Sequence, residues 1–222
     1  MRNIGILSLF IVILFSCSEE LNTKEFYFKP SDFRPAKTYK FQSLENPLKI
    51  EYWKISNIGK NEILTVRNNT KGQLIDELKE KLSEKGSILT SYKRSFTGGE
   101  WIMTSEFYPK ERELMKWDLK EKSNYDGEFV INGIIWNLKR EREFLEITEL
   151  KFDSDNYETL IFKDKYFLKP LSNPNQNLKE WLDKTVNNFI QYSYFAKGIG
   201  LVKYKREYDN GEIETMELVE IN

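Results

Sequence analysis

The stretch GLVKYKREYDNGEIETMELV, residues 200–219, points to the fold of this chain of 222 residues. Apolar and polar side chains alternate over residues 200–207 and again over 213–219, which is the period of a strand with one buried face. Between them, Asp209-Asn210-Gly211 is typical of a tight hairpin turn. The stretch therefore predicts two antiparallel strands at the end of the chain.

The same alternation recurs before this hairpin and predicts further strands. They are expected at residues 38–41, 48–55, 63–66, 88–96, 101–107, 114–119, 129–139, 144–152 and 157–168. Aromatic residues make up 14% of the chain, and the pleated faces of sheets accept such large flat side chains. So many strands in one domain are expected to curl into a barrel, a half-barrel or a sandwich.

Two segments change to the period of a helix. The first, residues 70–86, combines an apolar stripe with a capping box and a glycine C-cap. Its residues are the stripe Leu74, Ile75, Leu78 and Leu82, the capping box Thr70 and Gln73, and the C-cap Gly86. The second segment, 177–192, carries a similar stripe, although 189–195 also fits a strand. The expected class is α+β, a mainly antiparallel curved sheet (half-barrel or barrel-like) with one or two packed helices.

The N-terminus has the pattern of an export signal. Arg2 precedes an apolar run at 4–15, which is shorter than the about 20 residues that span a bilayer. The run ends in Leu14-Phe15-Ser16-Cys17, which resembles the lipobox of bacterial lipoproteins, with a bulkier Phe15 than is usual there. This resemblance implies cleavage before Cys17, the only cysteine in the chain, and acyl chains on its sulfur and new amine.

The lipobox resemblance makes residues 1–16 a signal peptide. The alternation that begins at Phe26 separates a tether (17–25) from a single β-rich domain (26–222). Ser18-Glu19-Glu20 resembles the acidic tract of surface-exposed lipoproteins of Bacteroidota-type bacteria, with a plain solvated tether as the alternative. Together these resemblances imply a lipid-anchored protein of the outer membrane of a Gram-negative bacterium. With Cys17 acylated, the mature domain cannot form a disulfide, so its stability must come from its core.

The segment YFAKGIGLVK, residues 194–203, resembles a segment near the C-terminus of many uncharacterised bacterial lipoproteins and secreted β-rich proteins. That resemblance implies a curved sheet of half-barrel shape and assigns no catalytic residue. Gly198 and Gly200 lack the third glycine and the following helix of a dinucleotide-binding fingerprint. We expect both glycines to shape the backbone at the start of a strand.

Composition excludes several classes of function. The chain has no histidine, which excludes Ser-His-Asp and Cys-His catalysis and zinc sites with imidazole ligands. A metal would need oxygen ligands alone, as calcium and magnesium do. The formal net charge is −1 and no basic block is present, which argues against a nucleic-acid partner.

Two charged segments and one group of acids are candidates for a metal-binding or catalytic site, and none of them predicts such a site. Asp153-Ser154-Asp155-Asn156 lacks the glycine and glutamate of a calcium loop, which favours a turn. Lys139-Arg140-Glu141-Arg142-Glu143 alternates in charge and is interpreted as a solvated turn or strand face. The acids that could form a carboxylate pair for glycoside hydrolysis are Glu111, Glu113, Asp118 and Glu121. Such pairs arise by chance among 35 acids, so Cys17 is the only site residue predicted.

Three hypotheses about function follow. The favoured one is a non-enzymatic envelope lipoprotein, attached to the membrane through Cys17, whose curved sheet binds an apolar ligand or a protein partner without a cofactor. The others are a structural accessory subunit of an outer-membrane assembly and a carboxylate-based enzyme acting on glycans. An apolar cavity would favour the first, and a filled core with an exposed apolar patch the second. Two carboxyl groups roughly 5 to 10 Å apart in a cleft would favour the third.

Overall fold

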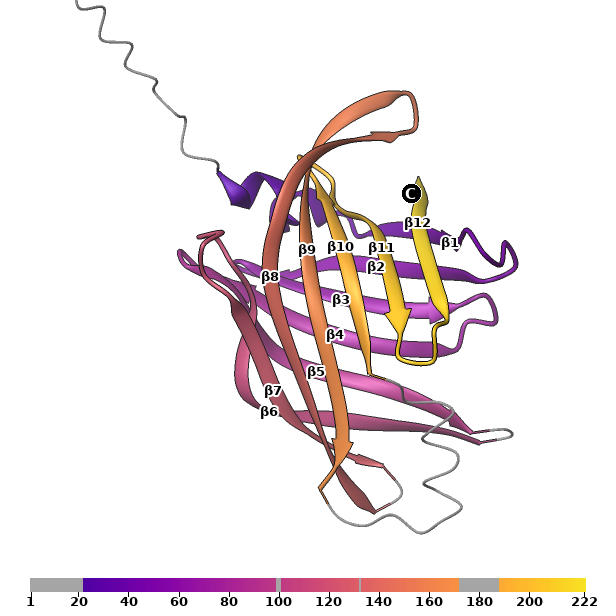
Figure 1. Ribbon diagram of the computed structural model, residues 1–222. Helices are drawn as coiled ribbons and strands as arrows, with labels where there is room; N and C mark the ends of the chain where they lie inside the picture. Colours follow the sequence, from indigo (N-terminus) through magenta and orange to yellow (C-terminus); the bar gives the residue numbers. More distant parts are fainter. Residues whose placement is uncertain (1–21, 99–100, 132, 172–187) are drawn as a thin grey trace, which may run out of the picture.

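The structure, a computed structural model, describes residues 22–98, 101–131, 133–171 and 188–222. Over these ranges the chain forms a closed antiparallel barrel of twelve strands, preceded by two short 3-10 helices (Figure 1). The elements are η1 (Thr23–Phe26), η2 (Pro30–Phe33), β1 (Lys37–Ser43), β2 (Ile50–Gly59), β3 (Glu62–Asn69), β4 (Leu74–Leu82), β5 (Gly86–Gly98), β6 (Trp101–Lys116), β7 (Ser123–Ile131), β8 (Ile134–Phe152), β9 (Asp155–Pro170), β10 (Phe189–Ala196), β11 (Gly200–Tyr208) and β12 (Ile213–Ile221).

Each strand pairs with its neighbours in the chain, and β1 pairs with β12 to close the barrel. In this closing pair Tyr39 lies opposite Ile221 and Ser43 opposite Met216. Closure removes the unpaired strand edges that an open sheet would expose. The expected curved antiparallel sheet and its barrel alternative are thus confirmed, whereas the half-barrel is wrong because the sheet closes on itself.

The helix predicted at 70–86 is wrong, because these residues form the hairpin turn before β4, β4 itself and the start of β5. Leu78 of β4 lies opposite Thr65 of β3 and Tyr92 of β5. A spacing of four, as between Leu78 and Leu82, places two residues on the same side of a helix and also on the same face of a strand. The apolar stripe was therefore compatible with both structures, and the pairing with β3 and β5 decides for the strand.

The two end signals of that predicted helix have other roles. The predicted capping-box residues Thr70 and Gln73 belong to the β3–β4 hairpin, where the amide of Gln73 donates to the side-chain oxygen of Asn69 at 3.0 Å. Gly86 begins β5, and a Cβ there would collide with the carbonyl oxygen of Met115. Glycine is required at this position by the close approach of two backbones, not by the end of a helix.

The second predicted helix, at 177–192, lies partly outside the described residues, which leave out 172–187. From Phe189 onward the chain is strand β10, so the alternative of a strand at 189–195 is confirmed. The expected strand at 129–139 is two strands, with Gly133 at φ +74° in the turn between β7 and β8. Conversely, the two strands expected at 101–107 and 114–119 are mainly one long strand, β6.

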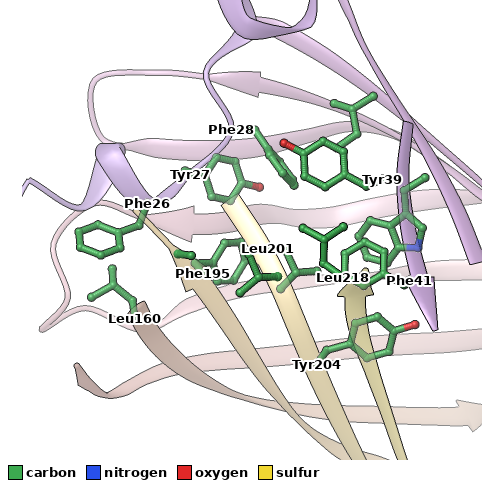
Figure 2. Packing of buried hydrophobic residues seen from close by; sticks show 14 of the residues in the cluster. Phe26, Tyr27, Phe28, Tyr39, Phe41, Leu160, Phe195, Leu201, Tyr204 and Leu218 are labelled. Carbon is green, nitrogen blue, oxygen red and sulfur yellow. The ribbon is translucent and has the colours of Figure 1, made fainter. Parts of the chain in front are cut away.

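The N-terminal segment, residues 22–36, closes one end of the barrel, and we call it the plug. Its side chains Phe26, Tyr27 and Phe28 are buried among residues of the barrel wall (Figure 2). Phe33 belongs to the same buried cluster. Wall residues of this cluster include Tyr39, Phe41, Leu160, Phe195, Leu201, Tyr204 and Leu218. The plug thus supplies much of the apolar core at this end of the molecule.

Two glycines shape the wall next to the plug, as the sequence predicts. Gly198 has φ +79° and Gly200 has φ +95°, a region that favours glycine. The amide of Gly198 donates to the carbonyl of Glu25 in the plug at 2.8 Å. The expected backbone role of these glycines in the turn before β11 is therefore confirmed.

The outward faces of the strands carry cross-strand ion pairs. Lys203 and Glu217 lie 2.6 Å apart on β11 and β12, and Lys110 and Glu128 lie 2.5 Å apart on β6 and β7. Such exposed pairs add little stability individually but suit a face in contact with water. Among the described residues, no helix is long and apolar enough to span a bilayer.

Candidate functional site

A cavity of about 250 Å³ lies inside the barrel. It extends from Tyr27 and Phe28 of the plug to Phe189 and Tyr208, which lie near the other end of the barrel. Its volume is just below the roughly 300 to 1,000 Å³ of typical ligand pockets. Five arginines and three carboxyl groups line it, namely Arg67, Arg94, Arg140, Arg142, Arg206, Glu51, Asp76 and Glu80. This cavity is the candidate functional site.

The alternation of strand β8 places two of these arginines inside. Arg140 and Arg142 are 3% and 7% exposed, whereas Lys139 and Glu141 form an outward ion pair at 2.7 Å. The interpretation of residues 139–143 as a solvated face is therefore wrong for Arg140 and Arg142 and correct for Lys139 and Glu141. The reason is the period of two, which sends every second residue of a strand into the barrel.

Arg142 is held by a bidentate ion pair. Its Nε and Nη2 donate to the two carboxylate oxygens of Asp164 on β9 at 2.6 and 2.9 Å. The hydroxyl of Ser193 on β10 donates to the same carboxylate at 2.7 Å. Burial alone would raise the pKa of Asp164. The adjacent Arg142 guanidinium lowers this pKa by more than burial raises it, so the net pKa is below its ordinary value. The pair is therefore ionised and fully engaged.

Arg67 and Glu51 form a second group on neighbouring strands. Nε of Arg67 donates to Asp76 of β4 at 2.5 Å, and its guanidinium lies 4.8 Å from the ring centre of Trp53. Glu51 accepts hydrogen bonds from Trp53 Nε1 at 2.8 Å and from the Tyr204 hydroxyl at 2.9 Å. Aromatic side chains therefore both stack on the arginine and satisfy the carboxylate.

Arg206 on β11 forms a third group. It donates to Gln191 on β10 at 2.9 Å and to Glu214 on β12 at 3.3 Å. Its guanidinium lies 4.6 Å from the ring centre of Tyr204. The Tyr208 hydroxyl donates to Glu214 at 3.0 Å. Three of the lining arginines, Arg67, Arg142 and Arg206, thus each have a carboxylate partner.

Glu80 links the plug to the wall. Its carboxylate is 1% exposed and accepts a hydrogen bond from the Tyr27 hydroxyl at 2.6 Å and another from Ser87. Burial raises the pKa of Glu80 above its ordinary value, even though these hydrogen bonds favour the ionised form. The plug is therefore attached through a polar contact as well as through its aromatic rings.

The remaining wall of the cavity is apolar and aromatic. It is formed on β5 to β8 by a second buried cluster that is separate from the plug cluster. Members that line the cavity are Leu89, Tyr92, Leu114, Tyr125 and Leu138, with Leu78, Tyr166 and Leu168 packed against them. The cavity is therefore amphipathic, with guanidinium groups beside rings and aliphatic side chains.

Apart from Arg140 and Arg142, the candidate residues singled out in the sequence lie elsewhere. Cys17 is outside the described residues. Glu113 and Glu121 both pair with Lys116, at 3.3 and 2.9 Å, and none of the four acids weighed for hydrolysis lines the cavity. Asp153 and Ser154 form the tight turn between β8 and β9, which confirms the turn, and Asp155 and Asn156 begin β9. Within the described ranges, no group of three or more acidic, histidine or cysteine side chains could hold a metal ion.

Comparison with known proteins gives two solved structures of similar overall shape. One is a candidate lipoprotein from Parabacteroides distasonis, with a TM-score of 0.49 and 10% identity over 84% of this chain and 94% of that chain. The other is a candidate exported protein with a YmcC-like fold from Bacteroides fragilis, with a TM-score of 0.46 and 10% identity over 84% and 95%. No family model matches the sequence, and no curated protein matches it. At this level of similarity, function has to be inferred from the chain's own residues.

Proposed function

We propose that this protein is a lipid-anchored envelope protein that binds a small ligand inside its barrel and catalyses no reaction. The observation that carries the proposal is the cavity of about 250 Å³ lined by five arginines. A barrel that served only as a structural part is expected to fill its interior with packed side chains. Open space beside buried cations supports binding instead.

The charged side chains inside the barrel are a poor way to stabilise the fold. Arg142 and Asp164 are both buried, and replacing such a pair by packed apolar side chains is often neutral or stabilising. A barrel wall of this length also offers many positions at which apolar residues would serve. The retention of arginines around open space supports a role in recognition.

The state of the carboxylates supports a role without catalysis. Asp164 is bonded to Arg142, and the lowered pKa of its carboxyl makes it a poor donor of protons at neutral pH. Glu80, whose pKa is raised by burial, is occupied by the hydroxyls of Tyr27 and Ser87. A glycoside hydrolase needs a free acid and a second free carboxylate.

The mixed wall favours a ligand with two kinds of surface. An entirely apolar ligand would desolvate the guanidinium groups without pairing them, which costs free energy. An entirely polar ligand would leave the rings and aliphatic side chains of β5 to β9 without a partner. The expected apolar ligand is therefore revised to a small amphipathic one.

The position of the plug supports an orientation on the membrane. The plug begins at Asn22, five residues after Cys17, and five residues reach at most about 18 Å. An acylated Cys17 would therefore hold the plugged end of the barrel close to the lipid surface. The opposite end of the barrel, near Phe189 and Tyr208, would face away from the membrane.

Native mass spectrometry tests the proposal directly. The protein is extracted from membranes of the source cells with a mild detergent, and its mass is recorded before and after unfolding. We expect a small molecule that is released on unfolding. A stoichiometric protein partner without any small molecule would contradict the proposal and support an accessory subunit.

A pair of neighbouring substitutions tests whether the ligand lies in the cavity. Leu168 lines the cavity, while Phe167 beside it is 43% exposed on the outward face. Leu168→Trp should remove the bound molecule from the purified protein, because the indole fills the space. Phe167→Trp should retain it. Equal retention by both variants would place the ligand outside the barrel.

A further inference from the structure

Arg140 differs from the other arginines of the cavity whose contacts are described above. Its Nη2 donates to the main-chain carbonyls of Leu114 at 2.5 Å and Glu113 at 3.0 Å. Its guanidinium lies 4.6 Å from the ring centre of Tyr125. Arg67, Arg142 and Arg206 each bind a carboxylate, whereas Arg140 is fixed by neutral carbonyls and a ring. Its hydrogen bonds thus go to neutral groups, and its closest carboxylate in the described residues, Asp164, lies 3.9 Å from Nε.

One donor of Arg140 makes no hydrogen bond. Its Nε is buried and makes no hydrogen bond, and the nearest oxygen of Asp164 is 3.9 Å away and already bonded to Arg142 at 2.6 Å. A buried cation with an unused donor is costly unless an anion approaches it. Arg140 is 3% exposed and lines the cavity, so an anion inside the barrel can approach its guanidinium.

The strand register shows what surrounds this donor. Arg140 lies opposite Tyr125 on β7 and Tyr166 on β9. Two residues further along the same inward face, Leu138 lies opposite Leu168. All of these side chains line the cavity. Arg140 is therefore flanked by two tyrosines and followed, in the direction away from the plug, by an aliphatic layer.

We propose that Arg140 is the anion-recognition residue of this cavity, and that its ligand is a small organic carboxylate with an apolar body. The carboxylate pairs with the guanidinium of Arg140 at the part of the wall that carries Tyr125 and Tyr166. The apolar body lies along Leu138 and Leu168. This inference rests on the proposed function, since it names the chemical class of the ligand that the cavity takes.

A pair of probes of equal length tests the charge requirement. Binding of octanoate and of 1-octanol to the wild-type protein is measured by isothermal titration calorimetry, after release of any bound molecule. We expect octanoate to bind at least tenfold more tightly than 1-octanol, because a buried guanidinium favours a carboxylate over a hydroxyl. Equal affinity for the two probes would overturn the inference while leaving a ligand-binding cavity in place.

Substitutions then assign the preference to one residue. Arg140→Gln should remove the preference for octanoate and retain the affinity for 1-octanol. Lys139→Gln removes the same charge from the outward face of β8 and should bind both probes as the wild type does. A preference that survives in Arg140→Gln, or that is lost equally in Lys139→Gln, would overturn the assignment to Arg140.

Two measurements keep the inference testable if Arg140→Gln does not fold. The first is a crystal of the wild type soaked with 8-bromooctanoate, in which the carboxylate should lie within hydrogen-bond distance of the Arg140 guanidinium and the bromine beyond Leu138. A carboxylate bound elsewhere would overturn the inference. The second is titration with inorganic phosphate. Phosphate binding as tight as octanoate binding would overturn the inference that the ligand has an apolar body. If no carboxylate binds, the inference fails, and native mass spectrometry decides separately whether the cavity has a ligand.

Discussion

Gly198 and Gly200 show how one missing Cβ can serve two different purposes. Both residues have positive φ, at +79° and +95°. A Cβ on Gly198 would meet nothing within 4 Å, whereas a Cβ on Gly200 would collide with the ring of Phe28 in the plug. Gly198 is therefore required only by its backbone conformation, and Gly200 also by the fit of the plug against the wall.

We predict that Gly200→Val destabilises the fold more than Gly198→Val. Positive φ costs a side chain roughly 1 to 2 kcal/mol at either position, and displacing Phe28 adds about 1 to 3 kcal/mol at Gly200 alone. Urea unfolding of the two variants and the wild type measures the difference. Equal losses of stability would show that the plug does not pack against Gly200.

Glu80 predicts a dependence of stability on pH. Burial raises its pKa in the folded protein above the ordinary value of 4.5, so the folded state binds the proton more tightly than the unfolded state. The stabilisation is complete below about pH 4.5 and is lost as the pH rises through the higher folded pKa. Glu80→Gln removes this titration and keeps a side chain that can accept the Tyr27 hydroxyl.

The stability of the wild type relative to Glu80→Gln should therefore fall as the pH rises above 4.5. Urea unfolding of both proteins at several pH values measures this difference. Taking the difference removes the contributions of other groups, such as Asp164, whose lowered pKa makes stability decrease as the pH falls. A constant difference across the range would show that Glu80 is accessible to water in the folded state.

Strand β4 illustrates how the barrel decides the character of a whole element. Asp76 and Glu80 of β4 are buried, while Lys81 is exposed. The interior is therefore polar at two positions of this strand, and its outward face is charged as well. For this reason β4 lacks the alternation of apolar and polar residues that predicts a strand. The spacing of four between its leucines remains, and this spacing also fits a helix.

The strand assignment of β4 predicts different effects for two neighbouring residues. Leu78 lines the cavity and Lys79 lies on the outward face. Leu78→Asp should lower stability by about 1 to 3 kcal/mol, because it places a carboxylate against the apolar wall. Lys79→Asp should stay within about 1 kcal/mol of the wild type, as surface substitutions usually do. Thermal unfolding of both variants measures this, and a similar loss in both would contradict the inward placement of Leu78.

At the scale of the whole molecule, the first and last strands of the chain, β1 and β12, pair to close the barrel. The N-terminal segment of the chain fills one end of this barrel. Thr23 is already buried in this packing, and its hydroxyl donates to the carbonyl of Trp117 at 2.6 Å. A tether attached to Cys17 would thus lead directly into the packed plug. In the proposed arrangement, anchor, plug and cavity lie in that order away from the membrane.

Cys17→Ala is expected to release the protein from the membrane or to leave its precursor uncut. The lipobox motif motivates this prediction, since an acyl anchor needs the thiol of Cys17. Cell fractionation and intact-mass measurement give the result, with Ser18→Ala as a control that should remain processed and membrane-bound. A Cys17→Ala protein that is still processed and acylated would show that the anchor lies elsewhere.

The sequence by itself determined the elements whose signals are local. Alternation and the Asp209-Asn210-Gly211 turn predicted the final hairpin, and positive φ at Gly198 and Gly200 agrees with the expected bend. These features depend on contacts within a few residues, so a pattern can report them. The lipobox at Cys17 is local in the same sense and remains a prediction.

Only the tertiary structure decided the nature of the interior. Arg140 and Arg142 looked like part of a solvated face because their partners are distant in the chain. Asp164, which neutralises Arg142, lies on the next strand, and its position opposite Arg142 follows from the strand register. Closure of the barrel brings such side chains together in a space without bulk water, and that makes arginines on a strand a candidate binding site.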